Sequence, residues 1–287
     1  MSGAARAATH ARLFESEPQL TDADGTKHWI TRAANFAVVV TEAAKGAVLA
    51  RADQADEYML LLPAGSEATV EAGPERITAS GDSLTIVPPG QSRITVAKSA
   101  RIVRVFSNTA ADIVAAAGNA GTYADGAPEV AALVPWPAPV GGFKLRHYRL
   151  ADHPSKDPSP LKMRVFQSSN LMINVFERWP SPRDERKLSP HSHDDFEQVS
   201  LGLEGAFTHH LRYPWTPEKA AWREDEHAHY AASPSVLVIP ARVVHTSQNV
   251  GAGIAWLIDV FGPPRVDFAA KPGFVVNGAD YPLPAGA

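Results

Sequence analysis

One short segment of the sequence carries residues that could hold a metal ion. His191 and His193 are one residue apart, and Glu197 follows them. Alternate residues of a β-strand point to the same face, so both imidazoles can face one space. A straight strand would place Glu197 about 13 Å beyond His193, which is too far for one ion because ligand atoms lie about 2 Å from it. The chain must therefore bend at Asp194–Phe196 before Glu197 begins the next strand.

A second segment can complete such a site. Pro240 ends an apolar run, a turn follows, and His245 begins the next run, with Asn249 shortly after it. Three imidazoles and one carboxylate offer only nitrogen and oxygen, a donor set that suits iron(II), manganese, nickel, cobalt or zinc. An ion that prefers six ligands would keep two open positions for substrate, water or dioxygen. The two segments together predict a four-ligand metal site.

The elements that must position these residues are predicted to be strands, because most apolar runs are short, rich in β-branched residues and separated by turn residues. In the first half the predicted strands are Phe36–Val40, Tyr58–Leu62, Ser83–Val87, Arg93–Val96 and Arg101–Phe106. In the second half they are Phe143–Leu150, Leu161–Phe166, Leu171–Trp179, Gln198–Leu203, Ala206–Leu211, Ser235–Ile239, His245–Val250 and Ala255–Phe261. Between the halves, we expect an alanine-rich helix at Ala110–Ala117 and a Pro- and Ala-rich linker at Ala127–Gly142.

Composition excludes several classes of protein. The chain has 287 residues, of which 45% are hydrophobic and 20% charged, and it contains no cysteine, so disulfides and thiolate ligands are excluded. The net charge is −4 without a basic block, so we expect no nucleic-acid partner. No apolar run reaches the ~20 residues of a membrane span, and the segment Met1–Leu20 lacks the apolar core of a signal peptide. We therefore expect no membrane partner and a cytoplasmic location.

The two metal-site segments resemble the two sequence motifs of the cupin superfamily. Pro190–Glu197 is similar to the first motif, with two histidines one residue apart and then a glutamate, and Pro240–Asn249 is similar to the second. Two positions depart from the pattern: Arg242 stands where glycine is usual, and Gly205 follows Glu197 one residue later than the common spacing. The resemblance implies four metal ligands: His191, His193, Glu197 and His245.

The first half of the chain repeats the second half in a weakened form. Arg51, Asp53 and Glu57 have the spacing of the first motif 140 residues earlier, and Arg93 matches His245 at an offset of 152 residues. Arginine is always protonated and cannot ligate a metal. The chain thus resembles a bicupin whose N-terminal barrel has lost its metal, and we expect an ion pair of Arg51 or Arg93 with Asp53 or Glu57 in the vacated space. The alternative is that these are solvated loop charges.

The expected fold is all-β, with two cupin (double-stranded β-helix, jelly-roll) barrels in tandem and a short helix and Pro-rich linker between them. The expected parts are a degenerate N-terminal barrel at 1–115, a helix end and linker at 116–142, and a metal-binding C-terminal barrel at 143–287. The offset between matched residues of the two halves is 140 at the first motif and 152 at the second, so the second half contains twelve additional residues between its motifs. We place them at Tyr213–His227, either packed on the barrel exterior or over a pocket mouth. A homodimer is also expected.

The resemblance implies a metal-dependent enzyme that acts on a small organic molecule. An iron(II)-type dioxygenase is favoured, because an apolar lining of the site is expected from Val199, Leu201, Trp256 and Ile258. The alternatives are a redox-neutral isomerase or lyase of a sugar acid, and a non-catalytic cupin that binds a metal or small molecule. The expected cofactor is one divalent ion (Fe, Mn, Ni, Co or Zn), with iron favoured. One of the neighbours His209 and His210 must face inward, where it could relay protons or simply be buried.

Overall fold

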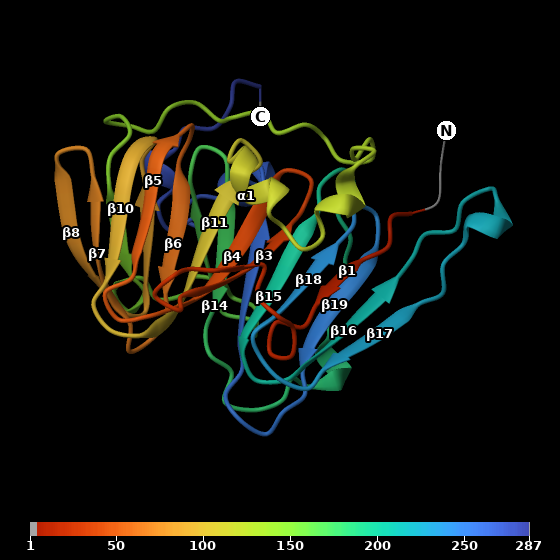
Figure 1. The fold of residues 1–287 in the computed structure, drawn as a ribbon. Coiled ribbons are helices and arrows are strands. Elements are labelled where there is room, and N and C mark those ends of the chain that lie inside the picture. The colour runs from red at the N-terminus through yellow and green to blue at the C-terminus, as the bar shows by residue number, and fades with distance from the viewer. Residues whose placement is uncertain (1–4, 287) are drawn as a thin grey trace.

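A computed structural model describes residues 5–286 and shows the expected all-β fold. Residues 1–4 of the expected N-terminal barrel and residue 287 of the expected C-terminal barrel lie outside the described part. Four antiparallel sheets form successive layers across the molecule (Figure 1). The helical elements are short: α1 (Ala111–Ala115), α2 (Val266–Ala269) and the 3-10 turns Ala120–Tyr123, Leu150–Asp152, Glu185–Lys187, Lys219–Ala221 and Gly278–Asp280. In the described chain, no helix has both the length and the apolar character needed to cross a bilayer.

The N-terminal barrel consists of a seven-stranded and a four-stranded sheet. The large sheet contains, in spatial order, β12 (Arg146–Arg149), β9 (Ser83–Val87), β6 (Tyr58–Leu62), β11 (Ala100–Ser107), β4 (Phe36–Ala43), β3 (Lys27–Arg32) and β2 (Leu20–Thr21). The small sheet contains β5 (Val48–Gln54), β10 (Gly90–Val96), β7 (Glu67–Ala72) and β8 (Glu75–Ser80).

The C-terminal barrel has the same two-sheet plan. Its six-stranded sheet contains, in spatial order, β1 (Thr9–Ala11), β18 (Ser235–Ile239), β15 (Gln198–Glu204), β20 (Trp256–Phe261), β14 (Met172–Phe176) and β13 (Met163–Gln167). Its three-stranded sheet contains β17 (Glu226–Tyr230), β16 (Phe207–Arg212) and β19 (Val244–Asn249).

The two large sheets pack face to face, and the main hydrophobic core lies between the barrels. Alternate residues of β15 and β20 face this core, and the residues between them face the inside of the C-terminal barrel. The core includes the four residues that we expected around the metal: Val199, Leu201, Trp256 and Ile258. That expectation is wrong, because in both strands the alternate set of residues faces the inside of the C-terminal barrel. The inward positions are Gln198 and Ser200 on β15 and Asp259 on β20.

Each half of the chain lends one strand to the large sheet of the other half. β1, near the N-terminus, pairs with β18, where Thr9 lies opposite Val238. β12, which follows the linker, pairs with β9, where Arg146 lies opposite Ile86. The expected division at 115 and 142 did not foresee this exchange, which ties the barrels together through backbone hydrogen bonds.

Candidate metal centre

The three predicted histidines come together where β19 begins. Each offers a ring nitrogen, and these three atoms lie within 4.8 Å of one another. His191 and His245 face each other across an isolated antiparallel bridge, with N···O distances of 3.1 and 2.8 Å. The His193 ring stacks on Phe196, with 4.5 Å between the ring centroids. The backbone bridge and the stacked ring thus hold the histidine group in place without a metal.

Hydrogen bonds to the backbone fix the tautomers of two of these histidines. Nδ1 of His191 lies 2.9 Å from the Ser189 carbonyl oxygen, and Nδ1 of His245 lies 2.9 Å from the Val243 carbonyl oxygen. A carbonyl oxygen can only accept, so both Nδ1 atoms donate and both Nε2 atoms keep a free lone pair. Metal-ligating histidines are held in the same way.

Gln198 is the fourth group that faces this space. Its Oε1 lies 3.0 Å from Nε2 of His193 and 3.3 Å from Nε2 of His245. Since Nε2 of His245 is an acceptor, no proton can link it to the amide oxygen. A cation between the two atoms would satisfy both lone pairs, so the group fits a metal ion.

A short hydrogen-bond chain orients the Gln198 amide. Ser200 Oγ donates to Asp259 Oδ1 at 2.6 Å, and Gln198 Nε2 donates to Ser200 Oγ at 3.0 Å. Because the serine hydroxyl uses its proton toward Asp259, it can only accept from the amide, which leaves the amide oxygen facing the histidines. The oxygen is thus preset as a ligand atom.

A small cavity of about 30 Å³ adjoins this group. Its enclosed part has room for an ion with about one water, and its remaining side is open to solvent. Its polar lining comes from Arg183, Ser189, His191, Gln198, His245, Thr246, Ser247 and Asp259, and its apolar lining from Leu161, Phe176, Trp179 and Leu257. Arg183 donates to the Ser247 carbonyl (2.8 Å) and to Ser189 Oγ (2.9 Å), and it has no ion pair with a carboxylate of the described chain.

Burial controls the protonation of the site. It lowers the pKa of His193 to about 4 and that of His245 to about 3, so both rings are neutral at physiological pH and free to ligate. It raises the pKa of Asp259 to about 7. The cavity therefore holds a carboxyl group that can gain or lose a proton near neutral pH.

The adjacent histidines on β16 face opposite sides of their sheet. His209 is 1% exposed, and its Nδ1 lies 2.7 Å from Ser247 Oγ, while its Nε2 has no partner in the described chain. Burial lowers the pKa of His209 to about 3. His210 points outward, where its Nδ1 lies 2.7 Å from Nδ1 of His227. Only His209 is near the barrel interior, and it stays a candidate for a supporting role there.

Glu197, the predicted carboxylate ligand, lies outside the histidine group. It is 2% exposed and accepts hydrogen bonds from the Ala34 N–H (2.6 Å) and the Tyr123 hydroxyl (3.1 Å). Both partners come from the N-terminal half, so Glu197 joins the barrels. The structure does not place Glu197 with the histidines, because Gln198 takes the inward position and its neighbour must face the other way. The sequence held a signal: counting from Gln198 removes the extra residue before Gly205.

Glu57 makes the matching contact in the opposite direction. It is fully buried and accepts from the Ser169 N–H and Ser169 Oγ, both at 2.9 Å, and from the Tyr281 hydroxyl at 3.0 Å. Arg146 lies 3.8 Å from it. Burial raises the pKa of Glu57 as it does that of Glu197. Glu57 and Glu197 therefore occupy equivalent positions in the two halves, as the repeat predicted. Both glutamates make hydrogen bonds to the other half of the chain.

The other ligand-equivalent positions of the N-terminal barrel also differ from expectation. Arg51 pairs with Ser92 across β5 and β10, as the two bridged histidines do in the other barrel, so Ser92 and not Arg93 takes the equivalent position. Arg51 donates to Asp112 Oδ1 at 2.8 Å. Asp53 and Arg93 are exposed. The expected ion pair among these residues is therefore not formed.

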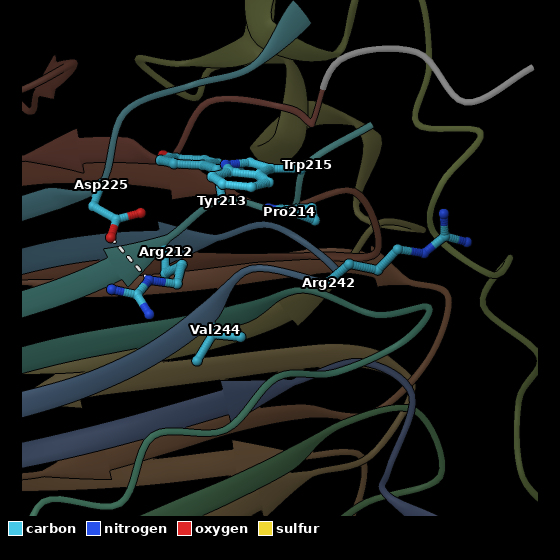
Figure 2. Close-up of a pocket in the computed structure, with 7 residues that line it drawn as sticks. All are labelled: Arg212, Tyr213, Pro214, Trp215, Asp225, Arg242 and Val244. Carbon is cyan, nitrogen blue, oxygen red and sulfur yellow. Dashed lines mark hydrogen bonds and ion pairs between the residues drawn. The ribbon is translucent and has the colours of Figure 1, made fainter. Parts of the chain in front are cut away.

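The inserted loop packs on the barrel exterior. Residues 213–225 join β16 to β17, whereas residues 73–74 join the matching strands β7 and β8. Trp215 and Trp222 of the loop stack on each other, with ring centroids 4.4 Å apart. The loop borders a hollow of about 600 Å³. Figure 2 shows its lining residues, among which Arg212 pairs with Asp225. These two side chains are 2.9 Å apart. No residue of the loop lines the cavity beside the histidines.

Comparison with known proteins supports the fold. No protein-family profile matches the sequence, and no curated protein matches it. Among solved structures, the Lactobacillus farciminis oxalate decarboxylase formate complex superposes with a TM-score of 0.56 at 15% identity, covering 84% of this chain and 81% of the other. Bacillus subtilis oxalate decarboxylase, studied for its Mn(II) centres, gives 0.59 at 14% identity, covering 92% and 79%. AerE from Microcystis aeruginosa gives 0.54 at 9% identity, covering 91% and 99%.

The alignments cover both barrels of this chain, between 84% and 92% of its length. Within residues 5–286, a group of three or more potential ligands from His, Cys, Asp and Glu occurs in the C-terminal barrel alone. The chain therefore has the two-barrel, all-β fold of these solved structures.

Proposed function

We propose that the C-terminal barrel holds one divalent metal ion and that the protein is a metal-dependent enzyme acting on a small carboxylic acid in a redox-neutral reaction. The ligand atoms are Nε2 of His191, His193 and His245 and Oε1 of Gln198. This proposal replaces the predicted Glu197 with its neighbour. The observation that carries it is the neutral donor group, of which His191, Gln198 and His245 line one partly open cavity together with Asp259 and Arg183.

The charge of the donor set favours redox-neutral chemistry. Three imidazoles and one amide carry no charge, whereas the expected carboxylate would have contributed one negative charge. A divalent ion bound here keeps its full positive charge and supplies Lewis-acid polarisation of a substrate oxygen. An anionic ligand would stabilise a higher oxidation state better than a neutral one does. An isomerase, lyase or decarboxylase is therefore favoured over the iron dioxygenase.

The residues around the donor group fit an anionic substrate that loses or moves a proton. Arg183 lines the cavity with a guanidinium that lacks a carboxylate partner among the described residues, so a substrate carboxylate can pair with it. The Asp259 carboxyl group faces the same cavity, and burial raises its pKa to about 7. In the metal-free site it can hold or release a proton near neutral pH, and a bound divalent cation would favour its carboxylate form, which can act as a general base.

The similar structures are consistent with this assignment. Two of them are oxalate decarboxylases, one with formate bound and one with Mn(II) centres. Because the identity is 15% or below, these names suggest what to test and do not define the reaction. Manganese is the first metal to load, and short dicarboxylic, keto and sugar acids are the first substrates.

The test is an anaerobic substrate screen with manganese-loaded protein. Each acid is followed by proton NMR and by carbon dioxide release, and the same panel is repeated in an oxygen electrode with iron-loaded protein. We expect turnover of at least one acid without oxygen uptake. Turnover that requires dioxygen would instead support the dioxygenase, which the apolar side of the cavity, with Phe176 and Trp179, would suit.

A further inference from the structure

The N-terminal barrel encloses an arginine that has no counter-charge. Arg104 on β11 is 7% exposed, and its Nε has no partner. Val103 and Val105 face the core between the barrels, so Arg104 faces the inside of its own barrel, next to Ile102 and Phe106. Its guanidinium makes no hydrogen bond or ion pair with any residue between 5 and 286, and its Nε is the nitrogen that is fully shielded from solvent. A buried charge without a partner is costly, and arginine cannot avoid the cost by losing its proton.

The acidic groups near Arg104 are already paired. Besides burial, the ionisable groups that act on it are Tyr58, the basic group of Arg51, and the carboxylates of Asp22 and Asp112. Asp22 Oδ2 lies 3.0 Å from Nε2 of His28. Asp112 binds both terminal nitrogens of Arg51. Neither carboxylate therefore neutralises Arg104, and burial lowers its pKa to about 10.

The space around Arg104 corresponds to the metal centre of the other barrel. Tyr58 and Ser92 occupy the positions of Gln198 and His245, and their hydroxyl oxygens lie 3.0 Å apart. One hydroxyl proton serves this contact, and the other remains free to donate. The Arg104 and Arg51 guanidinium carbons lie 5.6 and 5.4 Å from the centroid of the same Phe106 ring. The N-terminal barrel thus places one guanidinium without a counter-charge near hydroxyl donors, and these are groups that bind anions.

We propose that the N-terminal barrel binds one small monovalent anion, a halide or a short carboxylate, at the Arg104 guanidinium. The anion supplies the missing counter-charge and accepts from the free hydroxyl of the Tyr58 and Ser92 pair. The site is separate from the proposed metal centre, and its occupancy does not depend on the metal.

The experiment measures thermal unfolding of the full-length protein at constant ionic strength while chloride, bromide, formate or acetate is varied. A bound anion stabilises the folded state in proportion to the logarithm of its concentration, which for a chain of this size raises Tm by about 3 °C per tenfold increase above Kd. Wild type should show this slope, and the halide and carboxylate series identify the preferred anion. Arg104→Met should abolish the slope. Arg101→Met should keep it, because Arg101 lies on the same strand as Arg104 but already has a counter-charge, Glu42 of the neighbouring strand β4.

Equal slopes in wild type and Arg104→Met would overturn the proposal, as would a flat wild-type response to all four anions. If Arg104→Met does not fold, crystals of the wild-type protein soaked in bromide decide the question. An anomalous bromide peak beside the Arg104 guanidinium supports the site, and a guanidinium without one contradicts it.

Discussion

Removal of the Glu197 carboxylate should weaken the contact between the barrels and leave metal binding intact. In Glu197→Ala, the Ala34 N–H and the Tyr123 hydroxyl lose their acceptor in a buried site. Each unpaired group costs about 1–3 kcal/mol. Burial raises the pKa of Glu197, which means that desolvation of the carboxylate offsets part of its hydrogen bonding. We therefore expect a net loss of about 2–3 kcal/mol rather than the full sum.

Urea unfolding followed by tryptophan fluorescence measures this loss, and metal analysis of the same samples measures the site. Glu197→Gln is the matched control, because its amide oxygen can still accept from Ala34 and Tyr123. We expect its unfolding midpoint to lie near that of wild type. A Glu197→Ala protein that unfolds like wild type but has lost its metal would refute the assignment of Glu197 to the barrel contact.

Two further predictions concern the cavity. Asp259 binds its proton more tightly in the folded state, so its contribution to stability is present at pH 4 and is lost as pH rises to about 7. Without a metal, Asp259→Asn should therefore become more stable than wild type as pH rises over this range, by up to about 4 kcal/mol. Urea unfolding of both proteins measures the free energy of unfolding at each pH. A difference between the two free energies that does not change with pH would disprove the prediction. Arg183→Met should raise KM for the anionic substrate at least tenfold with unchanged metal content, and an unchanged KM would exclude Arg183 from substrate binding.

Strands with strong apolar character could be predicted from the sequence, and weakly apolar ones could not. The expected runs correspond to β4, β6 and β9 with little error, and the expected helix contains α1. The strands β5, β7, β8 and β17 were missed because they carry many polar residues and lie in the small sheets, whose outer faces are exposed. Exchange of β1 and β12 could not be foreseen, because local pattern does not say which sheet a strand joins.

The candidate site shows where sequence parity fails. Two histidines separated by one residue must share a face of a strand, and His245 follows a proline turn, so the triad could be found by spacing alone. Glu197 and Gln198 are neighbours, and the bend before them leaves the parity of the next strand open. A carboxylate is the more familiar ligand, and choosing it also turned the apolar face of β15 toward the site. Ser92 and Arg93 present the same ambiguity in the first half. The expected homodimer and cytoplasmic location stay predictions.

The central claim is that Gln198, and not Glu197, completes the metal centre. Metal content per chain, measured by inductively coupled plasma mass spectrometry after manganese loading and desalting, tests it directly. We predict about one ion per chain in wild type and in Glu197→Gln, and substantial loss in Gln198→Ala and in His245→Ala. Full retention in Gln198→Ala together with loss in Glu197→Gln would contradict the account.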